Sequence, residues 1–359
     1  MNHSNPPPAV LYREPADSAR RRESVPSSEP EPGFLKHYGR DLRHTTAENW
    51  NRFWFTPTDP ATLGLMRVLV GTMLVYTHWV WGLDFESFFG PESWVTSGLI
   101  QQYLQNDYVF SFWYIVPQQY AYPVHLLCVG LLGLFAVGLF TRVTSLLALV
   151  IVISYANRVP TALFGLDQIN GLLTFYLALG PSGAAYSLDA RLRQRSRPSD
   201  GDVPKQPAPG LGFDAVGPSI HANIATRLVQ VHMCVIYFFA GVSKLQGLAW
   251  WDGMAMWLAF SNQEYQTLDM LWLAKYPMAI HALTHFTIFW EVSYCVFVWV
   301  RVLRPLVLLF AVLLHAGIGL CMGMWTFALI MMIGNLAFVP PHVVRRLMSR
   351  RHRVKTFDC

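Results

Sequence analysis

The chain has 359 residues, of which 53% are hydrophobic and 14% charged, and its mean hydropathy is +0.30. This composition excludes a largely disordered chain, and the apolar residues form blocks that are too long for the half-buried helices of a soluble protein. The formal net charge of +5 reflects lysines and arginines that flank these blocks. We therefore interpret them as topology signals and expect no nucleic-acid partner.

Three polar stretches frame the apolar blocks. Residues 1–45 are rich in Pro, Ser, Glu and Arg, and they are expected to form a disordered cytoplasmic tail because they contain too little apolar surface to fold. Residues 46–345 form the predicted transmembrane domain, with a cytoplasmic linker at 188–220 between its halves. Residues 346–359 are predicted to be a basic cytoplasmic tail.

The apolar blocks predict an all-α, polytopic bundle of about eight transmembrane helices. A helix needs about 20 mostly apolar residues to cross a bilayer. Blocks near this length lie at residues 61–82, 122–140, 143–156, 160–180, 222–245, 282–300, 305–322 and 324–340. The third block is short for a full crossing, and the last is somewhat short, so the count is uncertain by one.

Lysine and arginine placement predicts the orientation. Basic residues precede the first span and follow the second, fourth, sixth and eighth, whereas the opposite loops contain only Arg158 and Lys275. This bias puts both termini in the cytoplasm. The outer segments at 85–120 and 248–260 are aromatic, so we expect them to lie at the membrane interface, where together they can roof a cavity that opens onto the bilayer.

Among the ionisable side chains inside the predicted spans, the sequence singles out Arg67, Asp167, Arg227, Lys244, Glu291 and His315. Each costs about 2.5 to 3.5 kcal/mol on insertion scales, which indicates a functional or interhelical role. Arg67 and Arg227 lie near cytoplasmic ends, where both snorkelling and a buried ion pair are open. Glu291 lies in mid-span, so it requires a cationic or hydrogen-bonding partner, or a proton.

Lys244 ends an apolar stretch, "IYFFAGVSK", with no acidic residue beside it. Tyr237, Gly241 and Lys244 have i, i+4 and i+7 spacing and so share one helix face, on which Gly241 leaves room for a neighbouring helix or a flat ligand. Two interpretations stay open for the amine. It either snorkels to the outer headgroups or, when desolvated, acts as a general base.

The sequence predicts no metal site. The five cysteines show no C-x-x-C spacing. His281 and His285 have the i, i+4 spacing of some metal ligands, but a single pair of this kind is a weak signal.

The stretch "YFFAGVSKLQGLAWWDG" resembles the lysine motif of vitamin K-dependent γ-glutamyl carboxylase and of its bacterial relatives, the horizontally transferred transmembrane (HTTM) family. Further stretches agree in order: "LGLMRVLVGTML" with Arg67, "GLFTRVTSLLALV" with Arg142, "YSLDA" with Asp189, and "LLHAGIGLCMGMWTFALIMMIGNLAF" with His315. The resemblance extends from about residue 50 to residue 345 and matches the membrane half of the carboxylase.

The resemblance implies a multi-pass protein of a bacterial inner membrane that handles a quinone. In the carboxylase a lysine deprotonates vitamin K hydroquinone, and Lys244 matches that lysine. The implied cofactor is reduced vitamin K or another lipophilic quinone. The residues that would line the cavity are Tyr237, Gly241, Trp251, Asp252, Glu291 and His315, and those of the structural family motif are Arg67, Arg142 and Asp189.

Two departures modify this expectation. Ser243 stands where the carboxylase has the first of two lysines, and the sequence ends 19 residues after Pro340, where the carboxylase continues into a lumenal β-rich domain. We therefore expect hydroquinone oxygenation by a lyase-like membrane core without carboxylation of peptides. The alternative is a non-catalytic scaffold or transporter-like bundle of the same family.

Overall fold

The computed structural model describes residues 34–104, 109–195 and 217–354, and every regular element in these ranges is a helix. The all-α prediction is confirmed for this part of the chain. The α-helices are α1 (Phe34–Phe55), α2 (Ala61–Leu83), α3 (Phe85–Phe89), α4 (Ser97–Leu104), α5 (Ala121–Val137), α6 (Thr141–Arg158), α7 (Gly165–Leu179), α8 (Leu188–Arg195), α9 (Ile220–Lys244), α10 (Leu248–Trp251), α11 (Ala255–Ser261), α12 (Pro277–Phe297), α13 (Arg304–Met322), α14 (Trp325–Asn335) and α15 (Pro341–Val354).

Four of the described helices are long and apolar enough to cross a membrane: α2, α5 with the short turn before it, α9 and α13. Helices α14 and α15 make a fifth candidate if they are counted as one span that bends by 115°. The predicted count of eight does not follow from these criteria. Helix α7 has only 15 residues, α6 includes Arg142 and Arg158 near its two ends, and α12 includes two histidines, which lower its hydropathy.

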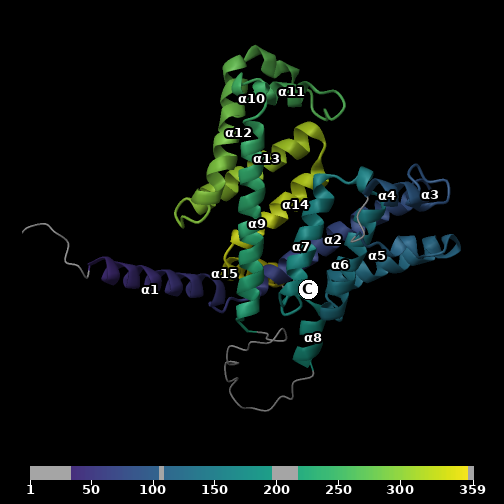
Figure 1. Ribbon diagram of the computed structural model, residues 1–359, viewed down its shortest axis with the longest axis horizontal. Coiled ribbons are helices and arrows are strands. Elements are labelled where there is room, and N and C mark those ends of the chain that lie inside the picture. The colour runs from purple at the N-terminus through teal and green to yellow at the C-terminus, as the bar shows by residue number, and fades with distance from the viewer. Residues whose placement is uncertain (1–33, 105–108, 196–216, 355–359) are drawn as a thin grey trace, which may run out of the picture. The chain divides into compact units, whose positions relative to one another are not determined.

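The helices form two packed groups that share one hydrophobic core (Figure 1). Helices α2, α5, α6 and α7 pack in sequence order, and α9 runs beside α12 while α13 lies against α14. Helix α7 joins the groups because it contacts both α9 and α14. Buried side chains at this centre include Met66, Leu173 and Met233.

The polar segments before α2 and α9 tie the starts of the two groups together. Thr58 and Ser219 form an isolated antiparallel bridge through two backbone hydrogen bonds of 3.1 and 3.0 Å. The Nδ2 of Asn223 donates to the carbonyls of Phe53 and Trp54 at 2.7 and 2.8 Å. These bonds satisfy backbone groups that the nearby helix ends leave without partners.

The predicted tails are partly helical. Residues 34–45, expected to be disordered, are the first part of α1, because apolar residues recur there at helical spacing after the last proline of the tail. Residues 188–195 of the predicted linker form α8, and 346–354 of the predicted basic tail belong to α15. Residues 1–33, 196–216 and 355–359 lie outside the described residues.

The aromatic segments expected on the outer side consist of short helices. The first contains α3 and α4, and the second contains α10 and α11 (Figure 1). The first segment covers a cavity of about 630 Å³ whose wall includes Trp81, Phe88, Trp94, Phe164 and Asp167. The second segment supplies no residue to that wall, so the two do not roof this cavity together.

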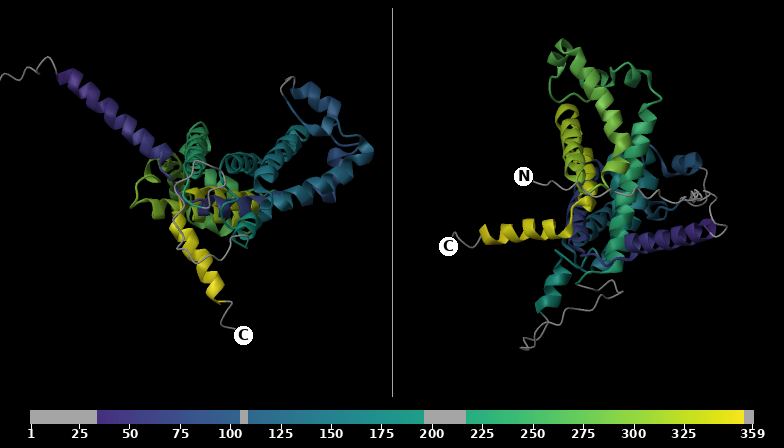
Figure 2. Two further views of the ribbon diagram at one scale, coloured as in Figure 1. Left: turned by 90° about the horizontal axis from the view of Figure 1, so that it is seen from below. Right: turned by 90° about the vertical axis from the view of Figure 1, so that its left-hand side faces the viewer.

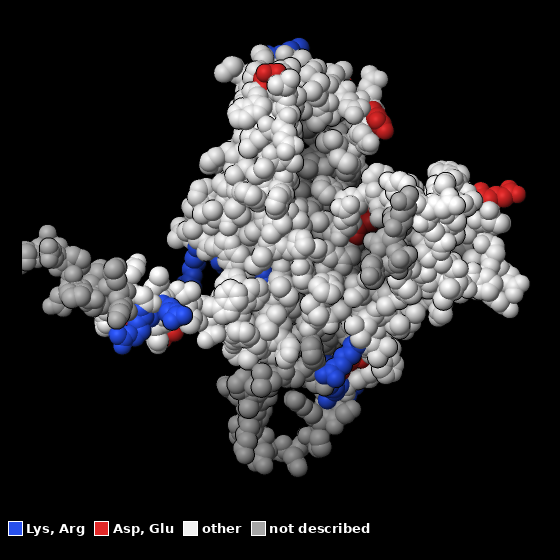
Figure 3. Space-filling view, viewed as in Figure 1, with Lys and Arg blue, Asp and Glu red and all other residues white. Residues whose placement is uncertain are grey.

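Helix α15 turns sharply away from α14, as the yellow helix shows in both views of Figure 2. Arg345 on α15 holds the start of α2, because its Nη2 donates to Asp59 Oδ1 at 2.7 Å and its Nε to Asp59 Oδ2. In Figure 3 basic side chains gather over α8, while the surface over α9, α12 and α13 is almost uncharged. This distribution fits an apolar belt with basic residues at one end.

Candidate functional site

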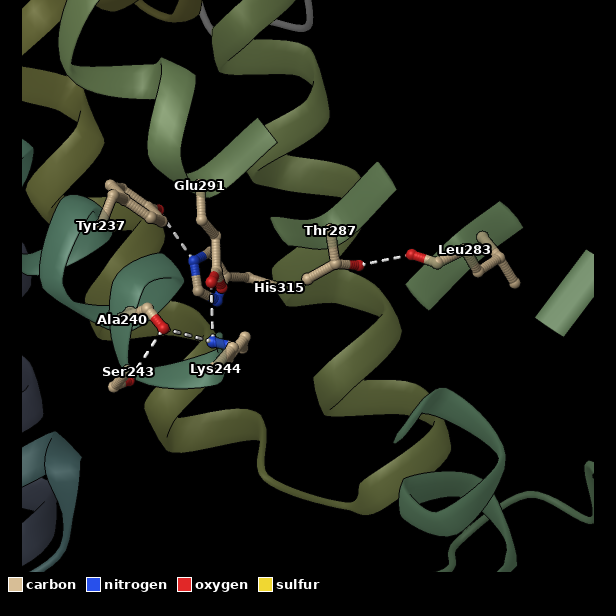
Figure 4. A network of polar contacts seen from close by, with 8 residues as sticks. All are labelled: Tyr237, Ala240, Ser243, Lys244, Leu283, Thr287, Glu291 and His315. Atoms are coloured by element: carbon tan, nitrogen blue, oxygen red, sulfur yellow. Dashed lines mark hydrogen bonds and ion pairs between the residues drawn. The ribbon is translucent and has the colours of Figure 1, made fainter. Parts of the chain in front are cut away.

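A cluster of ionisable side chains in the described core lies between α9, α12 and α13. Lys244 is the last residue of α9, Glu291 lies in α12 and His315 in α13. Figure 4 shows all three directed toward one another. Each of them is conspicuous separately in the sequence, and the fold brings them together.

Lys244 is paired with Glu291. Its Nζ lies 2.7 Å from Glu291 Oε2, and the two side chains are 23% and 8% exposed. The ammonium also donates to the carbonyl of Ala240 at 3.3 Å and lies 5.3 Å from the centre of the Trp250 ring. Lys244 has no acidic neighbour in the sequence but has one in the fold, and the predicted interhelical partner of Glu291 is confirmed.

The predicted face of α9 is confirmed. Tyr237 and Gly241 are buried and Lys244 is partly exposed at the end of the same face. A Cβ on Gly241 would lie 2.7 Å from Cγ2 of Val292 and 3.0 Å from its backbone nitrogen. Of the two occupants that the sequence left open beside Gly241, the structure has the neighbouring helix α12. This close approach allows Lys244 to reach Glu291.

A separate buried chain of hydrogen bonds extends from His315 into the core. Tyr237 Oη lies 2.8 Å from His315 Nε2, and Asn335 Nδ2 donates to Tyr237 Oη at 2.8 Å. Tyr294 Oη donates to Asn335 Oδ1 at 2.7 Å. The sequence analysis missed Asn335 and Tyr294, although an asparagine within an apolar helix is itself a signal of an interhelical bond.

Trp251 and Asp252 do not belong to this cluster. Trp251 is 62% exposed and its indole nitrogen donates to the carbonyl of Leu245 at 2.7 Å, while Asp252 is an exposed residue that follows α10. Trp250, which the sequence analysis passed over, provides the ring beside Lys244. The helical turn of α10 directs Trp250 and Trp251 to different sides. The sequence alone does not show which of two adjacent tryptophans faces Lys244.

The ring of His285 on α12 contacts two backbone carbonyls. His285 lies 2.9 Å from the carbonyl of His281 and 3.3 Å from that of Trp251. Within the described ranges no group of three or more His, Cys, Asp or Glu side chains could hold a metal ion.

The residues of the family motif lie at another place, where α5, α6 and α8 meet. Arg67 is fully buried and donates to the carbonyls of Phe135, Ala136, Ser182 and Tyr186 at 2.6 to 3.1 Å. It therefore neither snorkels nor forms an ion pair in the described structure. Its donors satisfy the last carbonyls of α5 and the loop after α7.

Asp189 caps the start of α6 at the same junction. Its carboxylate accepts from the backbone N–H groups of Phe140 and Thr141 at 2.9 and 2.8 Å and from the Thr141 hydroxyl at 2.7 Å. Although burial raises the pKa of Asp189, these hydrogen bonds and the charge of Arg193 lower it below 3.8. Arg142 is exposed beside a cavity of about 730 Å³ that Asp189 also lines. Asp189 and Arg142 therefore lie at this junction, away from Lys244, and the hydrogen bonds of Asp189 hold the start of α6.

Comparison with protein-family models, with curated proteins and with solved structures finds no match to this chain.

Proposed function

We propose that the protein is a multi-pass membrane enzyme in which the Lys244–Glu291 pair exchanges a proton with a lipophilic hydroquinone. One observation carries the proposal: an acid and a base lie 2.7 Å apart in an apolar helix bundle, with the carboxylate buried and the amine partly accessible. Such pairs are uncommon within apolar spans and typical of sites that move protons. The ordered resemblance to the HTTM family supports a quinone as the substrate class.

The partner carboxylate changes the role proposed for the lysine. An adjacent carboxylate stabilises the ammonium, so Lys244 cannot accept a proton unless it first gives one to Glu291. The pair therefore acts as a unit. Glu291 takes the phenolic proton, and the Lys244 ammonium stabilises the phenolate that forms in surroundings from which water is excluded.

For the membrane arrangement we propose eight crossings with both termini in the cytoplasm of a bacterium. The four helices that meet the length and hydropathy criteria would be joined by α6, α7, α12 and the α14 segment, which pack against them. The basic residues over α8 and α15 support a cytoplasmic position for both.

Product analysis in vesicles tests the chemical proposal. The protein is reconstituted with reduced naphthoquinone, oxygen, labelled bicarbonate and a glutamate peptide. We expect the quinone epoxide, with the second oxygen atom released as water, and no labelled peptide. The epoxide should be lost in Lys244→Ala and in Glu291→Gln. Epoxide at the level of empty vesicles in the wild type would refute the proposal.

A non-catalytic scaffold or transporter-like bundle is the second candidate, and the contact of Gly241 with Val292 favours it. This contact and the ion pair together fix α9 against α12, which is a sufficient structural role for both. Glu291→Gln separates the candidates. A scaffold tolerates the amide because its oxygen can still accept a hydrogen bond from Lys244, whereas a site in which Glu291 takes the phenolic proton loses its activity.

A further inference from the structure

The hydrogen-bond chain behind Lys244 has a fixed direction. The carbonyl of Met331 can only accept, and it lies 2.9 Å from Asn335 Nδ2, which identifies that atom as the amide nitrogen. Asn335 Nδ2 also donates to Tyr237 Oη, so the hydroxyl hydrogen of Tyr237 is available to His315 Nε2 at 2.8 Å. The alternative, in which Nε2–H donates to Tyr237 Oη, would leave the buried phenol hydrogen without an acceptor, so in a neutral His315 we place the proton on Nδ1.

The Nδ1 of His315 has no hydrogen-bond partner among the described residues, although the side chain is only 3% exposed. Leaving a buried donor without an acceptor costs about 1 to 3 kcal/mol, so such atoms are rare in folded proteins and require an explanation. Three residues, Tyr237, Asn335 and Tyr294, hold the imidazole in the tautomer that creates this donor.

The donor lies beside the ion pair. Figure 4 shows the imidazole of His315, the carboxylate of Glu291 and the Nζ of Lys244 directed toward the same region between the three helices. The cluster thus combines two donors, the Lys244 ammonium and the His315 Nδ1–H, with one acceptor, Glu291. The exposed fraction of Lys244 provides the access.

We infer that His315 Nδ1–H and Lys244 Nζ bind one oxygen of a lipophilic phenol or quinone, and that Tyr237, Asn335 and Tyr294 are positioning residues that fix the His315 tautomer. A single oxygen that accepts from both donors satisfies the buried imidazole and lies within reach of Glu291. This inference takes its ligand class from the proposed function, but it concerns binding and is tested without turnover.

Ligand binding in nanodiscs tests the inference with two flat probes that differ by one oxygen. We expect 2-methyl-1-naphthol to bind about 10-fold more tightly than 2-methylnaphthalene, which corresponds to one good hydrogen bond. Two amide variants then distinguish the ring nitrogens. The amide nitrogen of His315→Asn lies near the Nδ1 position, so the preference should persist, whereas that of His315→Gln lies near the Nε2 position, so the preference should be lost.

Thr287→Val is the matched control, because the Thr287 hydroxyl lies on the same helix as Glu291 and donates only to the carbonyl of Leu283. It should leave the naphthol preference unchanged. Histidine ¹⁵N chemical shifts should independently report Nδ1–H in the wild type and a mixture of tautomers in Tyr237→Phe. This measurement needs no ligand and does not depend on the amide variants folding.

The inference fails if the wild type binds both probes equally, if His315→Gln keeps the preference, or if the shifts report Nε2–H. Failure of the proposed function looks different. If the wild type prefers naphthol but forms no epoxide, the proposed enzymatic function is refuted and the binding site is retained. If the wild type forms epoxide but His315→Gln keeps the naphthol preference, only the proposed binding site is refuted.

Discussion

The Lys244–Glu291 pair makes a directional prediction about stability. Replacing Lys244 by Met leaves Glu291 in a position where its side chain is only 8% exposed, without its cationic partner. Replacing Glu291 by Gln leaves a lysine that is 23% exposed and keeps the Ala240 carbonyl and the Trp250 ring. The two deletions of one ion pair should therefore differ in effect.

The exposures indicate the size of the difference. Removing one partner of a buried pair destabilises by about 3 to 5 kcal/mol when the remaining charge has no water. Protonation of Glu291 limits the loss in Lys244→Met, so we expect about 3 kcal/mol. The remaining lysine in Glu291→Gln is partly hydrated, so we expect about 1 to 2 kcal/mol, a value typical of a lost hydrogen bond to a charged group.

Reversible unfolding by SDS titration in mixed micelles measures these free energies. The double variant should lose no more than Lys244→Met alone, because the single changes remove the same interaction. His342→Ala serves as the control, since this exposed residue on α15 should change the free energy of unfolding by less than about 0.5 kcal/mol. Equal losses for the two single variants, or additive losses in the double variant, would refute the reasoning.

Three further predictions follow from the structure. Gly241→Leu should separate α9 from α12 and lower the thermal midpoint in detergent more than the control Gly130→Leu does. The reason is that a Cβ at Gly241 would lie 2.7 Å from Val292, whereas a Cβ at Gly130 would meet open space. An unchanged midpoint in Gly241→Leu would contradict the observed contact. Burial raises the pKa of Asp59, but hydrogen bonds and the charge of Arg345 lower it below 3.8. Because the pKa of Asp59 is depressed in the folded state, the Asp59–Arg345 pair stabilises the folded protein by about 0.5 to 1 kcal/mol at pH values above the unfolded-state pKa. Asp59→Asn should therefore be less stable than the wild type at pH 7. This difference in the free energy of unfolding should vanish as the pH falls through the folded-state pKa. Reporter fusions after residues 100, 200, 265 and 355 should report outside, inside, outside and inside; a cytoplasmic signal at 100 or 265 would overturn the proposed orientation.

The hydrophobic blocks predicted the presence of the helices well and the positions of their ends less well. Each block from 61–82 to 324–340 contains a described helix, because a long apolar run stabilises a helix wherever it is buried. The same runs do not reveal where a helix ends. Phe140 and Tyr186 have φ of +49° and +52°, a conformation stabilised by the surrounding contacts and not by a turn residue such as glycine.

The candidate site was predictable only in its separate parts. The face of Tyr237, Gly241 and Lys244 follows from the period of one helix, so local spacing sufficed. Glu291 and His315 come from two other helices, and no local pattern reports how these pack against α9. A search for an acidic neighbour along the chain therefore missed the partner that Gly241 brings within 2.7 Å of Lys244.

Arg67 and Lys244 are both cations in apolar helices that match motif positions of the same family resemblance, and their surroundings separate their roles. Arg67 is inaccessible, and four carbonyls accept its donors. A cation that is fully buried and held by four backbone carbonyls is not accessible to a ligand, so its role is to join helix ends. Lys244 is partly accessible and lies beside a buried imidazole with an unused donor among the described residues. Spare hydrogen-bonding capacity together with access, and not charge alone, is the reason why we propose the chemistry at the Lys244 end of the bundle.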